Sequence, residues 1–498
     1  MELQMEKQKQ VCFEQVLDRT VEESFTADAV VPDALADVGG LLLTEGDFFL
    51  WRLDLSDGAA ELEGAIQATV CYTEEQTGAV AGFPVEVPVQ LRIAAETLSP
   101  EVRPFAVCRV SELSAQLMNS RKVRVRARLC VRLCGYRAGM LELTQGVAPS
   151  EQAVFTNRTP CRFDLPVAVE EQVFTSEETH PFRLSRPEDG RLLSSSAAVQ
   201  LEETKFVGGK VILQGKVVTT VLYRQPERTA PVTESFETPF SQLIEASTDA
   251  ALHTVRAQIQ LTSAELTVRP EEQALQTVYH LVAQLVCMTE LECDSLSDAY
   301  SNVSALELTM QEQRFAQYAQ LEPLRAEAED RIPCETQGMT VCGSRASLRA
   351  VSVENGAVSG AVDVAVLLQS QEGTVTSVRR ELRFSQPAET AAMLLAARPE
   401  EAYLSLDAEG VAVRVPVRLE LLSAQEQTLR QVTEICVGDK NSALDALPSV
   451  TLVRADASPD LWALAKRYCS SVEAIRSANP AQEDDDARAF LLLPKVRA

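Results

Sequence analysis

Long stretches of the chain alternate apolar and polar residues, which is the pattern of half-buried β-strands. In RKVRVRARLCVRL, residues 121–133, one face is apolar and the other is basic. The apolar face carries Val123, Val125, Ala127, Leu129 and Val131, and the basic face carries Lys122, Arg124, Arg126, Arg128 and Arg132. VAVRVPVRLELL, residues 411–422, alternates in the same way. Because proline cannot donate to a strand ladder, Pro416 predicts an edge position or a bulge.

One strand pattern occurs three times along the chain. ELEGAIQATVCY (61–72) aligns without a gap on ILQGKVVTTVLY (212–223), and AVSGAVDVAVLL (357–368) is a weaker copy. The glycines Gly64, Gly215 and Gly360 stay in register, and a glycine inside a strand predicts a bulge or a close backbone approach.

The spacing of these copies predicts tandem domains. We expect a mainly β chain with three antiparallel, sandwich-like repeats at 1–155, 156–300 and 301–440, the third degenerate. Strand order, and the choice between sandwich and barrel, stay open.

A different pattern closes the chain, in DLWALAKRYCSSVEAIRSANP (460–480). Leu461, Leu464, Ala465 and Tyr468 share one helical face, and Ser458 is a candidate cap for this helix. A second helix is predicted to start at a capping box formed by Ser470 and Glu473. Strand-like segments at 450–454 and 490–494 flank them, so residues 449–498 predict a small βααβ unit.

Charge narrows the classes of partner. The chain has 46 basic and 72 acidic side chains, a formal charge of -26, which disfavours nucleic acid and anionic membranes. The basic face of 122–132 is expected to be neutralised by acidic neighbours on adjacent strands; the alternative is that it docks an acidic partner. Because the first residues lack a signal peptide and no apolar run could span a bilayer, we expect a cytoplasmic chain without membrane insertion.

Candidate catalytic chemistry is sparse. The twelve cysteines contain no CxxC, so we expect reduced thiols, mostly in apolar surroundings, and no metal site; later oxidative cross-linking is the alternative. The histidines are His180, His253 and His280, and the GGK at 208–210 fits a hairpin turn better than a phosphate loop. We therefore expect no catalytic residues and no cofactor.

The C-terminal unit resembles a LysM module. Its matching positions are Leu461, Trp462, Ala465, Lys466, Arg467, Tyr468, Val472, Ile475, Ala478, Asn479 and Pro480. The sequence departs from the LysM pattern at 458–460, and its 481–488 loop, AQEDDDAR, is acidic and lacks the usual glycine. Trp462 is either an exposed anchor for a partner or a cover for the small core. The resemblance implies partner binding through Asp460, Leu461, Trp462, Lys466, Tyr468, Ile475 and Asn479.

The whole chain resembles the SPOCS-domain proteins of endospore-forming Firmicutes, most closely the SipL type. The resemblance rests on Pro32 and Asp33, GGKVILQG at 208–215 and SRKVRVRA at 120–127. It implies a non-enzymatic mother-cell scaffold of the spore coat at the forespore surface. Its LysM module would dock onto the coat-basement ATPase, stage IV sporulation protein A, and the chain would meet other coat proteins. The alternatives are a LysM protein that binds peptidoglycan or chitin-type glycans, and an enzyme such as a wall hydrolase.

Overall fold

The computed structural model describes residues 1–149, 153–182, 192–224, 231–441, 446–454, 459–480 and 490–496. The chain is mainly β, with antiparallel sheets and two short helices near the C-terminus in this described part, which confirms the predicted class. The strands follow one another in three sets of similar design.

The first set pairs its long strands in one sheet and its shorter strands in another. The sheets have the orders β1-β6-β5 and β2-β3-β4. The strands are β1 (Met5–Val30), β2 (Val38–Ser56), β3 (Ala59–Glu74), β4 (Val80–Ala94), β5 (Arg103–Asn119) and β6 (Lys122–Val147). Apolar side chains of both sheets fill one core between them, including the fully buried predicted set from Val123 to Val131. Because the two sheets stay separate and face each other, the unit is a sandwich.

The second set repeats this topology with the strand orders β7-β12-β11 and β10-β9-β8. Its long strands are not a separate sheet, because β7 pairs with β13 (Ser304–Gln320) and so joins them to the long strands of the third set in one eight-stranded sheet. Its strands are β7 (Phe155–Pro181), β8 (Leu192–Val207), β9 (Lys210–Tyr223), β10 (Val232–Glu245), β11 (Thr254–Arg269) and β12 (Ala274–Tyr300), with a 3-10 turn at Pro270–Glu272. Gly208 and Gly209 have positive φ and join β8 to β9, as expected of a hairpin turn.

The third set keeps the arrangement but interrupts two of its strands. Its strands are β13 (Ser304–Gln320), β14 (Leu324–Ile332), β15 (Thr340–Glu354), β16 (Ala357–Gln369), β17 (Val375–Pro387), β18 (Ala392–Pro399), β19 (Tyr403–Asp407) and β20 (Gly410–Lys440). β13 and β14 pair in succession along one edge of β20, and β18 and β19 along the other. No strand of a set extends more than one residue outside the range expected for its repeat. The division into domains stays a prediction.

Pro416 does not lie in an edge strand, so that expectation was wrong. β20 has neighbours on both sides, and Pro416 pairs with Glu327 of β14 without a register shift. On the other side its carbonyl accepts the N–H of Glu400, which lies in the break between β18 and β19. The N–H and C=O groups of one strand residue point to the same side of the strand. The position where Pro416 lacks an N–H therefore faces the break between β18 and β19, and no hydrogen bond of the sheet is lost there.

The repeated glycines hold a bulge and an aromatic contact in place. Gly64 and Gly215 pair with residues that flank a bulge in the preceding strand, and Gly360 lies one residue further from the bulge in its own preceding strand, as predicted. A Cβ on Gly215 would come within 2.2 Å of the Gln200 carbonyl oxygen and 2.6 Å of the Phe240 ring. Glycine is therefore needed because a side chain there would collide with backbone.

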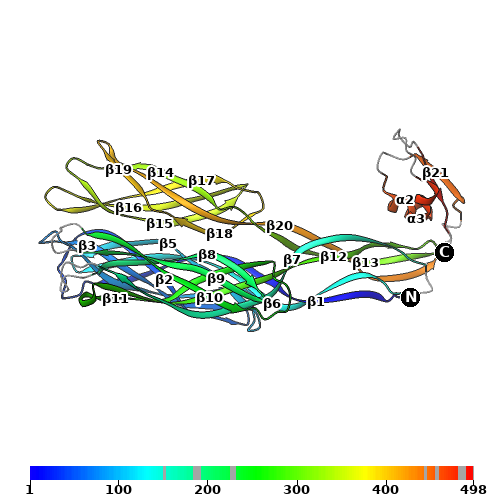
Figure 1. Ribbon diagram of the computed structural model, residues 1–498, viewed down its shortest axis with the longest axis horizontal. Helices are drawn as coiled ribbons and strands as arrows, with labels where there is room; N and C mark the ends of the chain where they lie inside the picture. The colour runs from blue at the N-terminus through cyan, green and yellow to red at the C-terminus, as the bar shows by residue number, and fades with distance from the viewer. Residues whose placement is uncertain are drawn as a thin grey trace.

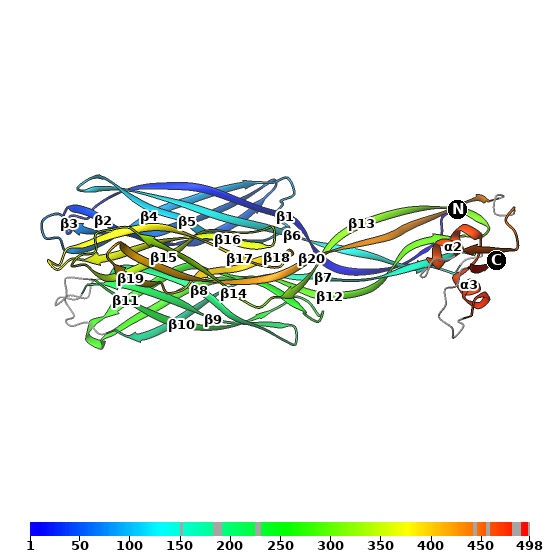
Figure 2. The same ribbon diagram turned by 90° about the horizontal axis from the view of Figure 1, so that it is seen from above.

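The sandwiches gather at one end of the molecule, and their long strands continue together as a stalk (Figure 1). We define the stalk as residues 1–15, 136–147, 155–165, 288–300, 304–320 and 422–440. Figure 2 shows the strands of all three repeats side by side in it. Phe163 and Phe315 stack with ring centroids 4.1 Å apart, and Gln431 bonds the β6 backbone at Glu142 and Thr144. The repeats thus share a core in the stalk.

At the other end the short-strand sheets of the three repeats meet in a shared cluster, which we call the hub. Its core includes Leu43, Leu193 and Leu367, one from each repeat. Glu45 of β2 accepts bonds from Ser194 of β8 and Arg345 of β15. The sandwiches are therefore fastened to one another at two levels, the hub and the stalk.

Candidate functional site

The C-terminal module, residues 449–498, has the expected element order. Its elements are β21 (Val450–Arg454), α2 (Leu461–Tyr468), α3 (Val472–Ala478) and β22 (Phe490–Pro494), with β21 and β22 antiparallel. Its apolar core contains Ala465, Ile475, Leu491 and Leu493, which are nearly or fully buried.

The helix caps differ from the predicted ones by one or two residues. Asp460 caps α2 by accepting the N–H of Ala463 at 3.0 Å, while the predicted Ser458 lies outside the described residues. Ser471, rather than Ser470, caps α3. Ser470 is buried, and its hydroxyl donates to the carbonyl of Pro494. The proposed capping box was wrong because Ser470 satisfies the β22 backbone instead.

The module is seated on the tip of the stalk through Trp462 and Lys466. The Trp462 Nε1–H donates to Asp298 of β12 at 2.9 Å, and Lys466 Nζ lies 2.8 Å from both oxygens of the same carboxylate. Burial alone would raise the pKa of Asp298, but the bonds from Lys466 and Trp462 outweigh it and hold that pKa below its ordinary value. One stalk carboxylate therefore binds two of the predicted site residues.

The same contact has an aromatic and a backbone component. The Trp462 ring meets Tyr300 edge-on, with centroids 4.8 Å apart. The Tyr300 hydroxyl donates to the carbonyl of Ser470 at 2.9 Å, and burial raises the pKa of Tyr300 to about 12. Asn302, in the turn after β12, donates to the carbonyls of Ser470 and Val496. Trp462 thus packs against the core of the module, in agreement with one of the two alternatives, and it also joins the module to the stalk, which neither alternative had included.

The other predicted site residues serve the module's own fold. Leu461 and Tyr468 pack against its core, and Ile475 is buried within it. Asn479 donates to the carbonyls of Ile475 and Leu492 and accepts the N–H of Leu492, which ties α3 to β22. Asp460, as cap, remains exposed. The structure brings only Trp462 and Lys466 to one shared contact, and partner binding by the set stays a prediction.

An apolar surface of the module was missed in the sequence. Val450, Leu452, Phe490 and Leu492 are 52%, 62%, 56% and 37% exposed. They lie on the outer face of the two-strand sheet, where Leu452 pairs directly with Leu492. The sequence does indicate this surface. FLLLP places apolar side chains on both faces of a strand, and because only one face can pack against the helices, the other must be exposed. We call these four residues the outer apolar face, and such a patch is a candidate contact surface.

The basic face of β6 is paired with acidic neighbours. Arg124 and Lys122 contact Asp28 of β1, and Arg132 contacts Asp18 at 2.7 Å. The hydrogen bonds from Arg124 and Lys122 lower the pKa of Asp28 well below its usual range. This matches the favoured interpretation of a solvated, neutralised face.

The histidines make structural contacts. His180 contacts the hydroxyls of Thr238 and Thr277 inside the second sandwich. His253 Nδ1 lies 2.8 Å from Oδ1 of Asp164, whose carboxylate is fully buried. The other oxygen of Asp164 accepts the N–H of Tyr318 in β13. The Asp164 carboxylate therefore makes a hydrogen bond between the second and the third repeat.

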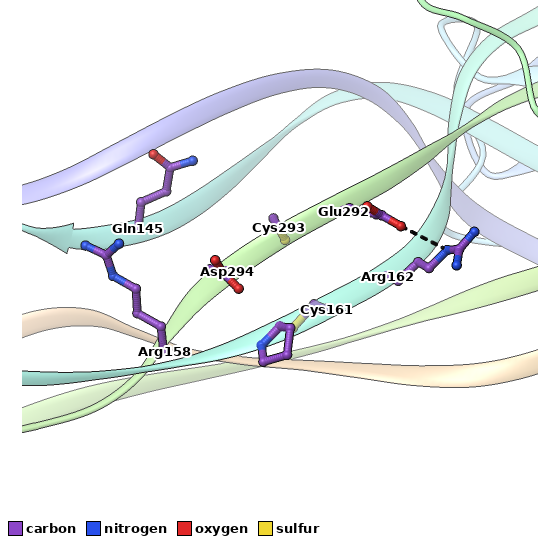
Figure 3. A pocket seen from close by; sticks show the side chains of 8 residues that line it. Gln145, Arg158, Cys161, Arg162, Glu292, Cys293 and Asp294 are labelled. Atoms are coloured by element: carbon purple, nitrogen blue, oxygen red, sulfur yellow. Dashed lines mark ion pairs between the residues drawn. The ribbon is translucent and has the colours of Figure 1, made fainter. Parts of the chain in front are cut away.

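An open pocket of about 690 Å³ lies in the stalk (Figure 3). It is lined by Gln145, Arg158, Pro160, Cys161, Arg162, Glu292, Cys293 and Asp294. Arg162 is paired with Glu290 at 2.6 Å and Glu292 at 3.4 Å.

Over the described ranges, no three His, Cys, Asp or Glu side chains gather as a metal site. No helix in the described part of the chain has the length and apolar run that a membrane span requires.

Comparison with known proteins gives one match. Residues 190–268 match the family model of the SipL SPOCS domain. This range contains β8, β9, β10 and nearly all of β11, which is the short-strand sheet of the second repeat and the strand that follows it. Searches of curated proteins and of solved structures found no match. The second repeat therefore contains a region similar to a SPOCS domain, and this match suggests a sporulation-related protein.

Proposed function

We propose that the chain is a non-enzymatic scaffold of sporulation that helps assemble the spore coat around the forespore, from the mother-cell cytoplasm. In this proposal it is a SipL-type protein whose first and third repeats are SPOCS-like units as well. The SPOCS match at 190–268 supports the link to sporulation. The shared two-sheet topology supports the extension to the other repeats.

We propose further that the C-terminal module is a LysM module and docks onto stage IV sporulation protein A. The observation that carries this docking role is the outer apolar face at the tip of the molecule (Figure 1). The stalk holds the module away from the sandwiches, which gives a large partner access to this face. Because Trp462 and Lys466 are bound to Asp298, the outer apolar face is the better candidate for first contact.

Binding of the full-length chain to purified stage IV sporulation protein A, measured by biolayer interferometry, tests the proposal. Leu452→Glu places a charge in the centre of the outer apolar face and is expected to weaken binding at least tenfold, as for a central interface residue. Leu243→Glu is the matched control, because Leu243 is an exposed leucine of β10, 45% accessible and far from the module.

Two results would contradict the proposal. One is equal binding by the Leu452→Glu variant and the Leu243→Glu control. The other is no binding to the ATPase together with strong retention of the full-length chain on chitin or purified peptidoglycan, which would favour the glycan-binding alternative. The Trp462 indole is partly buried and its ring and N–H are engaged by Tyr300 and Asp298 of the stalk, which argues against a sugar-binding role for that ring.

A further inference from the structure

Two cysteines face each other across neighbouring strands of the stalk. Cys161 of β7 and Cys293 of β12 are directly opposite in the antiparallel register. All twelve cysteines of the chain are described and are thiols outside any disulfide, and the register places no other two of them opposite each other. Cys108 and Cys130 also lie on paired strands, but Cys108 is opposite Val131, so their side chains leave opposite faces of the sheet.

The side chains of this pair share one face of the sheet and reach solvent. Cys161 Sγ lies 3.6 Å from Ser295 Oγ, and Ser295 is two residues from Cys293 on the same strand. Residues i and i+2 of a strand point the same way, so Cys293 is on the face that Cys161 uses. Both are partly exposed and line the stalk pocket (Figure 3).

The spacing of this pair meets the requirement of a disulfide. Directly opposite residues of antiparallel strands have Cα atoms about 4.5 or 5.5 Å apart, depending on the hydrogen-bonding position. Disulfides join residues whose Cα atoms are about 4.4–6.8 Å apart. We propose that Cys161 and Cys293 form an oxidation site that closes as a cross-strand disulfide when the chain meets a small-molecule disulfide such as glutathione disulfide.

The exchange runs in two steps and balances. One cysteine thiolate attacks a sulfur of glutathione disulfide, which gives a mixed disulfide and releases one glutathione thiolate. The thiolate of the second cysteine attacks the protein-side sulfur of that mixed disulfide and releases the second glutathione. In total, two protein thiols are oxidised to a disulfide and one glutathione disulfide is reduced to two glutathione molecules.

The surroundings set the rate and the consequence of this step. Burial raises the pKa of Cys293 to about 11, and the neighbouring Cys161 and Asp294 add to that shift. Because thiolates are the reactive species and the Cys293 thiolate becomes about a hundredfold more abundant between pH 7 and pH 9, closure is expected to be slow at pH 7 and much faster at pH 9. The bond would tie β7 to β12 within the stalk and close a covalent loop that contains β8, β9, β10 and β11.

Peptide mapping of the full-length chain tests the proposal. The folded chain is incubated with glutathione disulfide, unfolded in denaturant with N-ethylmaleimide to block the remaining thiols, and digested for mass spectrometry. We expect the peptides of Cys161 and Cys293 to be joined, lighter by two hydrogens than their sum, with Cys108 and Cys130 alkylated. Cys436→Ser, at an exposed cysteine, is the control and should leave this cross-link unchanged.

Single variants separate the pair from general oxidation. Cys161→Ser should remove the cross-link and leave Cys293 as its glutathione mixed disulfide, because no second thiol resolves it. The oxidised native chain should have a higher unfolding temperature than the reduced chain, and the variant should show no such rise. The proposal is overturned if both cysteines are alkylated after oxidation, remain glutathionylated in the native chain, or are joined to other cysteines.

Discussion

Replacing Asp47 by asparagine should stabilise the chain, and more so as the pH rises. Asp47 lies beside the hub on β2, and its Oδ2 accepts the N–H of Ala197 of β8 at 2.8 Å. Burial raises the pKa of Asp47 to about 7, and the nearby charge of Glu45 adds to the shift. An asparagine side chain can accept the same bond without a charge.

The magnitude follows from the difference between the folded pKa and the ordinary value. The folded pKa of about 7 exceeds 3.8 by about three units. At about 1.4 kcal/mol for each unit, this corresponds to about 4 kcal/mol. Asp47 keeps some solvent contact, so this figure is an upper bound and we expect about half of it.

The sign of the pH dependence is fixed by linkage. The folded chain holds the Asp47 proton more tightly than the unfolded chain, so the penalty is absent below pH 3.8. It grows as the pH rises through the range up to about 7 and is constant above that. The gain from Asp47→Asn should therefore be about 1 kcal/mol at pH 4.5 and about 2 kcal/mol at pH 8.

Urea unfolding followed by circular dichroism, on native and variant chains at pH 4.5, 6 and 8, measures this difference. Glu96→Gln, in the exposed loop after β4, is the matched control and should show no pH-dependent gain. A difference between native and Asp47→Asn chains that is the same at all three pH values would refute the reasoning.

Two further substitutions test other parts of the fold. Gly215→Ala should lower the free energy of unfolding by about 1–3 kcal/mol because its Cβ meets backbone, whereas Gly139→Ala, with open space around it, should leave the urea midpoint nearly unchanged. In a Trp51→Phe background, which leaves Trp462 as the one tryptophan, Asp298→Asn should weaken the attachment of the module to the stalk by about 1 kcal/mol and shift the Trp462 emission to the red. The Asp298 contribution is full above its ordinary pKa of 3.8 and fades as the pH falls further, so the same red shift should appear in the Trp51→Phe chain on strong acidification. An emission spectrum unaltered by the Asp298 substitution would contradict the proposed seating.

Features with a local period were predictable from the sequence. The buried and basic faces of 121–133 follow from the alternation of apolar and polar residues alone. The bulges beside the repeated glycines were predictable because glycine destabilises a regular strand and so usually marks a bulge there. The two helices of the module were also visible, although the cap at Ser471 was placed one residue early. Two adjacent serines are equally good caps locally, and only the buried bond from Ser470 to the carbonyl of Pro494 decides between them.

Features made by distant segments were not predictable. Nothing near Trp462 in the sequence indicates that Asp298 will accept its indole N–H, because that contact depends on the direction of a stalk built from all three repeats. The same holds for Pro416, whose strand looked like an edge until the break between β18 and β19 became visible. Long-range packing decided both cases.

Hydrogen exchange of the full-length chain, measured by mass spectrometry with and without stage IV sporulation protein A, tests the central claim most directly. If the module docks through its outer apolar face, the partner should slow exchange in 450–454 and 490–494 and leave the three sandwiches unchanged. Protection confined to the sandwiches, or an unchanged exchange pattern at saturating partner, would contradict the account.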